Sequence, residues 1–250
     1  MHAERRLLST ILRVGLALAV LGQIAWSFRP ATSTAQSDLE GQGKALYEAN
    51  CSTCHGLDAD GTENGPSLQG VGPASVDFML RTGRMPLANP ADQSERGEPK
   101  FTPLEIDALV AYVASIAPGG EPIPSVDTSA GDLALGAQVF LNNCAGCHGA
   151  GASGDSIGGG QIAPSLDPAD PTEIGEAVRI GPGLMPRFGP ETIDQQELDS
   201  LAAYLVWLRD HGNEGGLQLG RVGAVAEGLV AVVVGLGILI LVLRLTGAKR

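Results

Sequence analysis

The stretch that decides the fold is CSTCHG at residues 51–56, which returns as CAGCHG at residues 144–149. C-x-x-C-H is the attachment signature of a c-type haem. Two thiols three positions apart can reach the two vinyl groups of one porphyrin, and imidazole is the usual proximal ligand of haem iron. The motifs therefore predict two covalently bound haem c groups. The predicted attachment residues are Cys51, Cys54, Cys144 and Cys147, and the predicted proximal iron ligands are His55 and His148.

Two other readings of paired C-x-x-C motifs are a four-thiolate zinc site and a thioredoxin-like redox pair. The knuckles of a zinc ribbon usually lie about 15–20 residues apart and have no reason to be followed by His-Gly. Here Cys51 and Cys144 are 93 residues apart, and the two motifs use all four cysteines of the chain. No thiol is left for a disulfide or a nucleophile, so haem attachment is favoured.

The two motifs lie in a duplicated sequence. GKALYEANC at residues 43–51 matches GAQVFLNNC at residues 136–144, and the later Pro-Ser-Leu and Met-Pro pieces recur in the same order. Such an internal repeat indicates two copies of one structural unit. We expect one domain at residues 36–117 and a second at residues 133–211. Residues 118–132 are rich in proline, glycine and small polar residues, which is typical of a linker.

Both units are predicted to be mainly α-helical. Capping-box patterns predict helix starts at residues 37–40 and 102–105, and a third at residues 192–195. Residues 76–80 indicate a short helix, and the apolar spacing at 106, 109, 113 and 116 indicates one buried helical face. Gly43 and Gly136 would let the first and last helices of each unit approach closely. The aromatic residues expected to pack at or near these crossings are Tyr47, Tyr112, Phe140, Tyr204 and Trp207.

The sixth iron ligands are predicted to be methionines. The chain has four histidines, and the two outside the motifs, His2 and His211, stand near the membrane segments. Met85 and Met185 occupy matching places, each before a proline and downstream of one haem motif. Met79 lies in an apolar helical cluster, where packing explains it.

Each end of the chain carries a predicted membrane segment. Residues 1–35 combine arginines with an apolar run, which indicates a signal peptide cleaved after Ala35 or an uncleaved anchor. A second joint is expected at residues 212–220, followed by a transmembrane helix at 221–244. Within its apolar run at 222–243, Glu227 is the only charged residue. The basic tail at 245–250 predicts a cytoplasmic C-terminus, with both haem domains on the outer face of the cell membrane.

The composition excludes nucleic acid as a partner. Residues 36–210 hold 8 Lys and Arg against 25 Asp and Glu, a net charge of −17, whereas nucleic-acid binding needs a basic footprint. Plain solubility explains such a surface more simply than a docking role. Aromatic content is low, at 4%, and a buried porphyrin in each domain would supply the missing apolar bulk.

Both domains resemble class I cytochrome c, with a helix leading into C-x-x-C-H, a Gly-Pro-x-Leu loop or its Pro-x-Leu equivalent, a Met-Pro loop and a closing amphipathic helix. That resemblance implies that the carbonyls of Pro66 and Pro164 accept the N–H of His55 and His148. The whole layout, together with RTGRMPL at residues 81–87 and IDALVAY at 106–112, is similar to the dihaem cytochrome cc subunit of the Gram-positive-type cytochrome bcc complex, the menaquinol:cytochrome c reductase.

This family resemblance implies an electron-transfer subunit of an enzyme complex. Its implied partners are a cytochrome b subunit, a Rieske iron–sulfur subunit and a terminal oxidase. Two other classes stay open from the sequence. One is the dihaem subunit of a cbb-type oxidase, normally anchored at its N-terminal side. The other is a dihaem peroxidase, against which the paired methionines argue because such an enzyme needs one iron with an exchangeable site.

Overall fold

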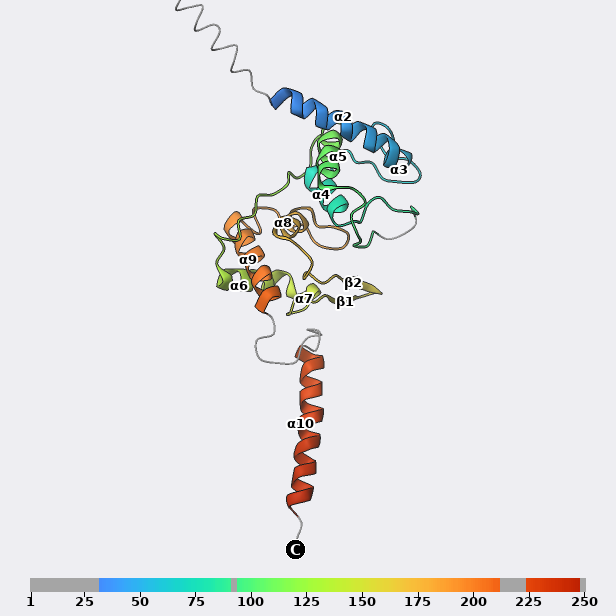
Figure 1. Cartoon of the computed structure of the whole chain (residues 1–250). Helices are drawn as coiled ribbons and strands as arrows, with labels where there is room; N and C mark the ends of the chain where they lie inside the picture. The colour runs from blue at the N-terminus through green and yellow to red at the C-terminus, as the bar shows by residue number, and fades with distance from the viewer. Residues whose placement is uncertain (1–31, 91–93, 212–223, 248–250) are drawn as a thin grey trace, which may run out of the picture.

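The computed structural model describes residues 32–90, 94–211 and 224–247, and over these residues the fold is mainly helical, as expected (Figure 1). The first domain contains α2 (Thr32–Asn50), α3 (Ser52–His55), α4 (Pro73–Arg81) and α5 (Pro103–Ile116). The second contains α6 (Leu133–Asn143), α7 (Ala145–His148), β1 (Asp155–Gly158), β2 (Gln161–Ala163), α8 (Pro171–Ile180) and α9 (Gln195–His211). The predicted signal or anchor segment at 1–31 and the joint at 212–220 lie outside the described residues.

The first and last helices of each domain cross at a glycine. A Cβ atom on Gly43 would lie 2.0 Å from the carbonyl oxygen of Ala108, and one on Gly136 would lie 2.0 Å from that of Ser200. No side chain fits at such a distance, so α2 can pack on α5, and α6 on α9, only because these residues are glycines. The sequence-based expectation of a close helix approach is confirmed in both copies.

Aromatic pairs fill the space beside each crossing. The rings of Tyr47 and Tyr112 are 5.5 Å apart, and those of Phe140 and Tyr204 are 5.8 Å apart, both tilted. Tyr47 and Phe140 are fully buried. Trp207 packs as expected, but at the surface: its side chain is 40% exposed and stacks on the outside of α9 between the rings of Tyr204 and His211.

One of the three predicted capping boxes forms as expected. Thr102 accepts from the Glu105 N–H, and the Glu105 carboxylate accepts from the Thr102 N–H at 2.8 Å. At α9 the prediction is wrong by two residues, since the reciprocal pair is Asp194 with Glu197, at 2.9 Å in both directions. The predicted start at residues 37–40 is also wrong. Helix α2 begins at Thr32, and no Gly or Pro in residues 31–40 stops it from extending upstream.

The β1–β2 hairpin was not predicted. The two strands pair antiparallel, with Ser156 opposite Ile162 and an irregularity before Gly158. The hairpin lies between His148 and Pro164, which are 16 positions apart in sequence, whereas His55 and Pro66 are 11 positions apart. The extra residues of the second copy therefore form a local addition and leave the helical frame unchanged.

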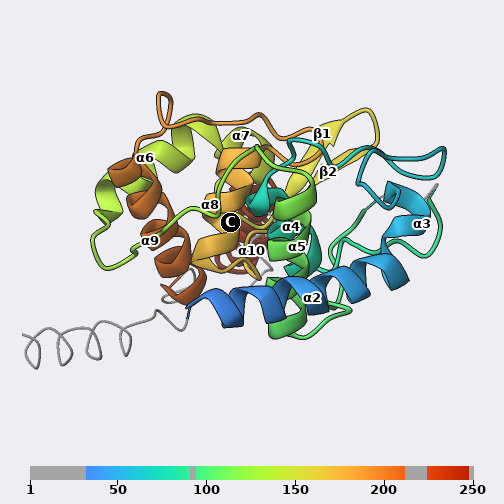
Figure 2. The ribbon, with the colours of Figure 1, turned by 90° about the horizontal axis from the view of Figure 1, so that it is seen from above.

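The two domains are in direct contact. Helices α4 and α8 pack against each other, and Figure 2 shows them side by side between the outer helices of the two domains. The linker from 118 to 132 has no helix or strand and is held by both domains. The carbonyl of Glu121 accepts from Ala74 N–H at 3.0 Å, and that of Ser125 accepts from the Gln195 amide at 2.8 Å. The linker at residues 118–132, called the strap below, is therefore packed against both domains.

Helix α10 (Ala224–Thr246) carries the predicted C-terminal anchor. The described part of the chain contains one helix long and apolar enough to cross a membrane, at Gly228–Thr246, with a mean hydropathy of 2.7. The span ends two residues beyond the predicted limit at 244. About 20 apolar residues cover the hydrocarbon core of a bilayer, so α10 suits a membrane anchor.

Candidate functional site

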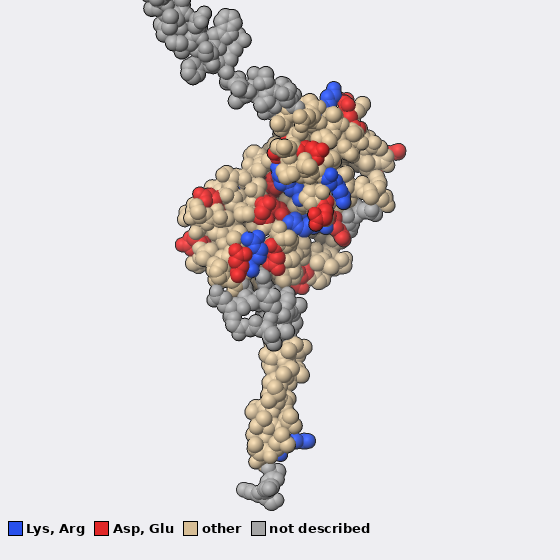
Figure 3. All heavy atoms as spheres, viewed as in Figure 1, with Lys and Arg blue, Asp and Glu red and all other residues tan. Residues whose placement is uncertain are grey.

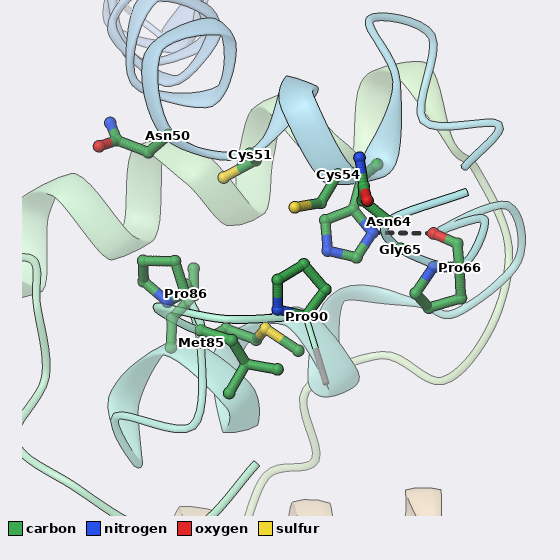
Figure 4. Close-up of a pocket in the computed structure, with 12 residues that line it drawn as sticks. Asn50, Cys51, Cys54, Asn64, Gly65, Pro66, Met85, Pro86 and Pro90 are labelled. Carbon is green, nitrogen blue, oxygen red and sulfur yellow. Dashed lines mark hydrogen bonds between the residues drawn. The ribbon is translucent and has the colours of Figure 1, made fainter. Parts of the chain in front are cut away.

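A pocket in the first domain brings together the residues singled out by the sequence. It is lined by Cys51, Cys54, His55, Pro66 and Met85, and its cavity volume is about 110 Å³. Figure 4 shows the sulfur atoms of Cys51 and Cys54 on one wall and that of Met85 on the facing wall.

The same backbone geometry presents the motif in both domains. The N–H of Cys51 continues the helical pattern by donating to the Tyr47 carbonyl at 2.8 Å, and His55 N–H then donates to the Cys51 carbonyl at 2.9 Å. In the second domain Cys144 donates to Phe140 at 2.8 Å and His148 to Cys144 at 2.9 Å. The short helices α3 and α7 thus fix two thiols and one imidazole on a single turn.

Each histidine is oriented by a proline carbonyl. The distance from His55 Nδ1 to the Pro66 oxygen is 2.8 Å, and that from His148 Nδ1 to the Pro164 oxygen is 2.9 Å. A carbonyl can only accept, so Nδ1 carries the proton and Nε2 keeps its lone pair. A fixed ring with a free Nε2 is the arrangement of a metal-ligating histidine. These contacts confirm the two hydrogen bonds expected from the resemblance.

A glycine six residues after each histidine supports this contact and was missed by the sequence reasoning. Gly61 has φ +86° and donates its N–H to the His55 carbonyl, and Gly154 has φ +84° and donates to the His148 carbonyl. A Cβ on Gly61 would lie 2.6 Å from Ser67 N, beside Pro66, and one on Gly154 would lie 2.6 Å from the Ala163 oxygen. The equal spacing in the two repeats was the signal that could have identified them.

The second domain holds the equivalent residues in its core. Cys144 and His148 are each 8% exposed, while Cys147 is exposed. Met185 packs against the same hydrophobic cluster that contains Cys144 and Phe140, as Met85 packs against the cluster that contains Tyr47. The structure therefore places one methionine against the hydrophobic cluster of each domain.

The two sites differ at the position of Tyr47. Tyr47 is fully buried and its hydroxyl donates to the carbonyl of Gly56 at 2.8 Å, immediately after the ligand histidine motif. Burial, with smaller contributions from neighbouring charges, raises the pKa of Tyr47 to about 12, so this hydroxyl keeps its proton. Phe140 occupies the matching position and has no hydroxyl. The first motif therefore accepts a hydrogen bond from Tyr47 that Phe140 cannot donate in the second domain.

Comparison with known proteins places the chain in a family. Residues 41–117 match the family model described as cytochrome c, and residues 131–205 match the model of the cbb3-type cytochrome C oxidase subunit III. The cytochrome bc1 complex cytochrome c subunit of Corynebacterium efficiens is 32% identical over 260 residues, covering 95% of this chain and 87% of the relative. That of Mycobacterium tuberculosis is 33% identical over 245 residues, covering 93% and 88%.

The chain belongs to the cytochrome bc1 complex cytochrome c subunit family. The family resemblance found from the layout is therefore confirmed. A cbb3-type cytochrome c oxidase subunit of Rhodobacter capsulatus is 28% identical over 124 residues, which cover 45% of this chain and 39% of the relative. That likeness reaches only part of the molecule.

Cytochrome c domains carry covalently bound haem c, and the residues present fit that group. The donor set is two thiols, one imidazole with a free Nε2 and one thioether around open space in the first domain. Burial first, and the neighbouring cysteine second, raise the pKa of Cys51 and of Cys144 to about 11. Zinc ligation and thiol exchange need thiolates, whose formation a lowered pKa favours. The raised pKa of Cys51 and Cys144 therefore argues against both of those alternatives.

The charge pattern of this cytochrome agrees with its composition. On the face seen in Figure 3, the basic side chains of the two domains lie beside acidic ones rather than in a separate basic patch. Two of the eight basic residues within 36–210 form ion pairs between the domains or with the strap: Arg96 pairs with Glu173, and Arg187 pairs with Glu121.

Proposed function

We propose that the chain binds two haem c groups and carries electrons from the quinol-oxidising core of a cytochrome bc1 complex to a terminal oxidase. Membership of the cytochrome bc1 complex cytochrome c subunit family supports the complex. The observation that carries the haem stoichiometry is the duplicated ligand geometry, with each imidazole held by a proline carbonyl and a methionine set against the same core. Bound haem c would supply a one-electron Fe(III)/Fe(II) couple.

Each residue has a defined role in this proposal. Cys51 and Cys54 would attach one porphyrin, and Cys144 and Cys147 would attach the other. His55 and His148 would ligate iron through Nε2, while their Nδ1–H bonds to Pro66 and Pro164 fix the ring planes and raise ligand basicity. Met85 and Met185 would supply the remaining iron ligands. A thioether ligand raises the reduction potential relative to a second imidazole, which suits electron delivery to an oxidase.

The proposed partners follow from the same family. A cytochrome b subunit and a Rieske iron–sulfur subunit would deliver electrons, and a terminal oxidase would accept them. Helix α10 would hold the chain in the cell membrane, with both domains on the outer face and the C-terminus in the cytoplasm, as the basic tail favours. The first domain would receive electrons and the second would deliver them. The chain would act as the electron-transfer part of the enzyme complex, without a substrate-converting site of its own.

A subunit of a cbb3-type oxidase is the second candidate, favoured by the family model matched at residues 131–205. The match to the cbb3-type oxidase subunit of Rhodobacter capsulatus covers under half of the chain, whereas the match to the bc1 complex subunit of Corynebacterium efficiens covers most of it. A peroxidase would need one iron with an exchangeable ligand. Two methionines in equivalent positions give both irons a sixth ligand and oppose that function.

Spectroscopy of the purified full chain tests the proposed ligands. Two equivalents of iron should give the near-infrared charge-transfer band of methionine-ligated ferric haem, and the reduced protein should not bind carbon monoxide tightly. One high-spin haem, or tight carbon monoxide binding by the native protein, would contradict a carrier and favour an enzyme.

Purification through an affinity tag on the chain tests the complex. Cytochrome b and Rieske subunits should copurify from solubilised membranes. Recovery with oxidase subunits alone would favour the second candidate.

A further inference from the structure

Two carboxyl groups meet at the contact between the domains, away from the residues proposed to hold iron. Asp77 on α4 and Glu176 on α8 are 2% and 1% exposed. Helices α4 and α8 are the elements through which the two domains pack (Figure 2). Carboxyl groups are almost never fully buried unless paired, so this pair calls for a specific explanation.

The hydrogen bonds around the pair require a proton. Both oxygens of Asp77 accept from Arg81 Nε, at 2.9 and 2.8 Å, and Arg81 also donates to Asp107. The carboxyl group of Glu176 lies within hydrogen-bonding reach of Asp77. An ionised carboxylate can only accept, so two carboxyl groups form a hydrogen bond only when one of them is protonated. Because Arg81 stabilises the charge of Asp77, the proton resides on Glu176.

The other charged groups near Glu176 do not replace this proton. The charges acting on it are those of Asp77, Asp170 at the start of its own helix, and Arg81, with only the last favouring ionisation. Arg179, one turn along α8, donates to the carbonyls of Phe188 and Ile193. On α9, Asp199 accepts from Asp127 N–H and the Gln195 amide. Among the described residues, Glu176 Oε1 has no hydrogen-bond partner.

We propose that Asp77 and Glu176 share one proton across the domain interface, and that loss of this proton to solvent loosens the contact between α4 and α8. Ionised Glu176 would lie, fully buried, against the carboxylate of Asp77. Like charges at this distance cannot both be accommodated in a buried site with one arginine. No electron moves in this step, and the inference does not depend on the iron ligands.

The direction of the pH effect follows from burial. Burial, then the charge of Asp77, raises the pKa of Glu176 from its ordinary value of 4.5 to about 9. The docked state thus holds a proton that the separated state releases. Docking is fully favoured below the ordinary pKa, weakens as pH rises through the range up to about 9, and is constant above it. The docking equilibrium should fall by up to about tenfold per pH unit in that range.

Infrared spectroscopy of the full chain tests the proton. The wild type at neutral pH should show the carbonyl stretch of a protonated carboxylic acid, shifted in D₂O and lost as pH rises through about 9. Glu176→Gln should lack this band, whereas the matched control Glu48→Gln, at an exposed glutamate paired with Lys44, should keep it. A wild-type spectrum without a titrating band would overturn the proposal, whatever the variant does.

Trypsin tests the loosening of the interface. Arg96 is bound by Glu173 across the interface, so cleavage after Arg96 should report separation, with cleavage after exposed Arg209 as the internal reference. From about pH 7 to about pH 9, relative cleavage after Arg96 should rise by up to about tenfold per unit in the wild type. In Glu176→Gln, whose amide still donates to Asp77, it should stay low. Equal pH profiles in the two proteins would overturn the coupling.

Discussion

At the scale of single residues, the two sites use main-chain groups to set the chemistry of side chains. The carbonyls of Pro66 and Pro164 fix the protonated nitrogen of each histidine, so Nε2 is the atom left to bind. A main-chain acceptor cannot be removed by changing a side chain. Of the proposed iron ligands, the methionine is therefore the one that a mutation can exchange most cleanly.

Met185→His should leave covalent attachment intact, because attachment depends on Cys144 and Cys147. The reduction potential of the second domain should fall, since a second imidazole replaces a thioether. A spectroelectrochemical titration of the full chain should show one potential lowered and the other unchanged. Met85→His should give the mirror result for the first domain. Cys147→Ala is the contrasting variant, which should impair maturation of the second domain. If Met185→His left both potentials where they were, the ligand assignment would be wrong.

Tyr47→Phe should destabilise the first domain by roughly 0.5–1.5 kcal/mol, the usual net value of one hydrogen bond. The change removes the donor to the Gly56 carbonyl and keeps the ring beside Tyr112. Phe140 already occupies this position in the second domain, so the fold tolerates the substitution. The measurement is the denaturation midpoint of the full chain, with Tyr204→Phe as a ring-preserving control. An unchanged midpoint would mean that the Tyr47 hydroxyl adds nothing to stability.

At the scale of helices and loops, the sequence predicts the features that depend on contacts between residues close together in the chain. The box at Thr102 and Glu105 forms because both partners lie within one turn. The pattern at residues 37–40 failed because a capping motif is also compatible with a helix interior, and its signal is overridden when no breaker precedes it. At α9 the reciprocal capping bonds are made by Asp194 and Glu197, and not by the predicted pair that starts at Thr192. The hairpin at 155–163 has no counterpart in the first copy, so comparison of the two repeats could not predict it.

The helix crossing gives an element-scale test with a built-in control. Gly43→Ala should destabilise the first domain by about 1–3 kcal/mol, because the new methyl group would lie 2.0 Å from the Ala108 oxygen and push α2 from α5. Gly41→Ala, two residues away on α2, meets no atom within 4 Å. It should instead stabilise by roughly 0.5–1 kcal/mol through helix propensity. Thermal unfolding followed by circular dichroism measures both, and equal effects would refute the close-packing argument.

At the scale of the whole molecule, the interface depends on residues far apart in sequence. Arg96 donates to both carboxylate oxygens of Glu173, at 2.9 and 2.6 Å, and to the carbonyl of Pro168 at 3.1 Å. Arg187 pairs with Glu121 of the strap. No local pattern relates residues 77 positions apart, so the sequence could predict two similar domains but not how they dock. Each charge alone was indistinguishable from a solvated surface residue.

A double-mutant cycle of Arg96→Ala and Glu173→Ala should give a coupling energy of roughly 1–3 kcal/mol, because the pair is bidentate and largely shielded from solvent. The side chains are 28% and 15% exposed. The exposed pair of Lys44 and Glu48, at 59% and 47%, is the matched control and should give only about 0.3–0.5 kcal/mol. Unfolding midpoints in denaturant supply the four values of each cycle. A coupling no larger than that of the control would mean that Arg96 and Glu173 do not hold the domains together.

The strap gives the last test, which concerns how electrons cross between the domains. Tunnelling falls steeply with distance, so rapid transfer needs domains that stay docked. A Gly/Ser insertion after exposed Ile123 would lengthen the strap while leaving its contacts at Glu121, Ser125 and Asp127 free to form. Loop closure costs only about 0.6 kcal/mol for each doubling of length.

If the contacts between the domains hold them, quinol-dependent oxygen consumption by membranes should not change as the insertion grows. The same insertions combined with Arg96→Ala should make turnover depend on insertion length, because the strap then contributes more to keeping the domains docked. Turnover that varies with insertion length while Arg96 and Glu173 are intact would instead mean that the domains separate during electron transfer and that the docked arrangement is only one of the states they occupy.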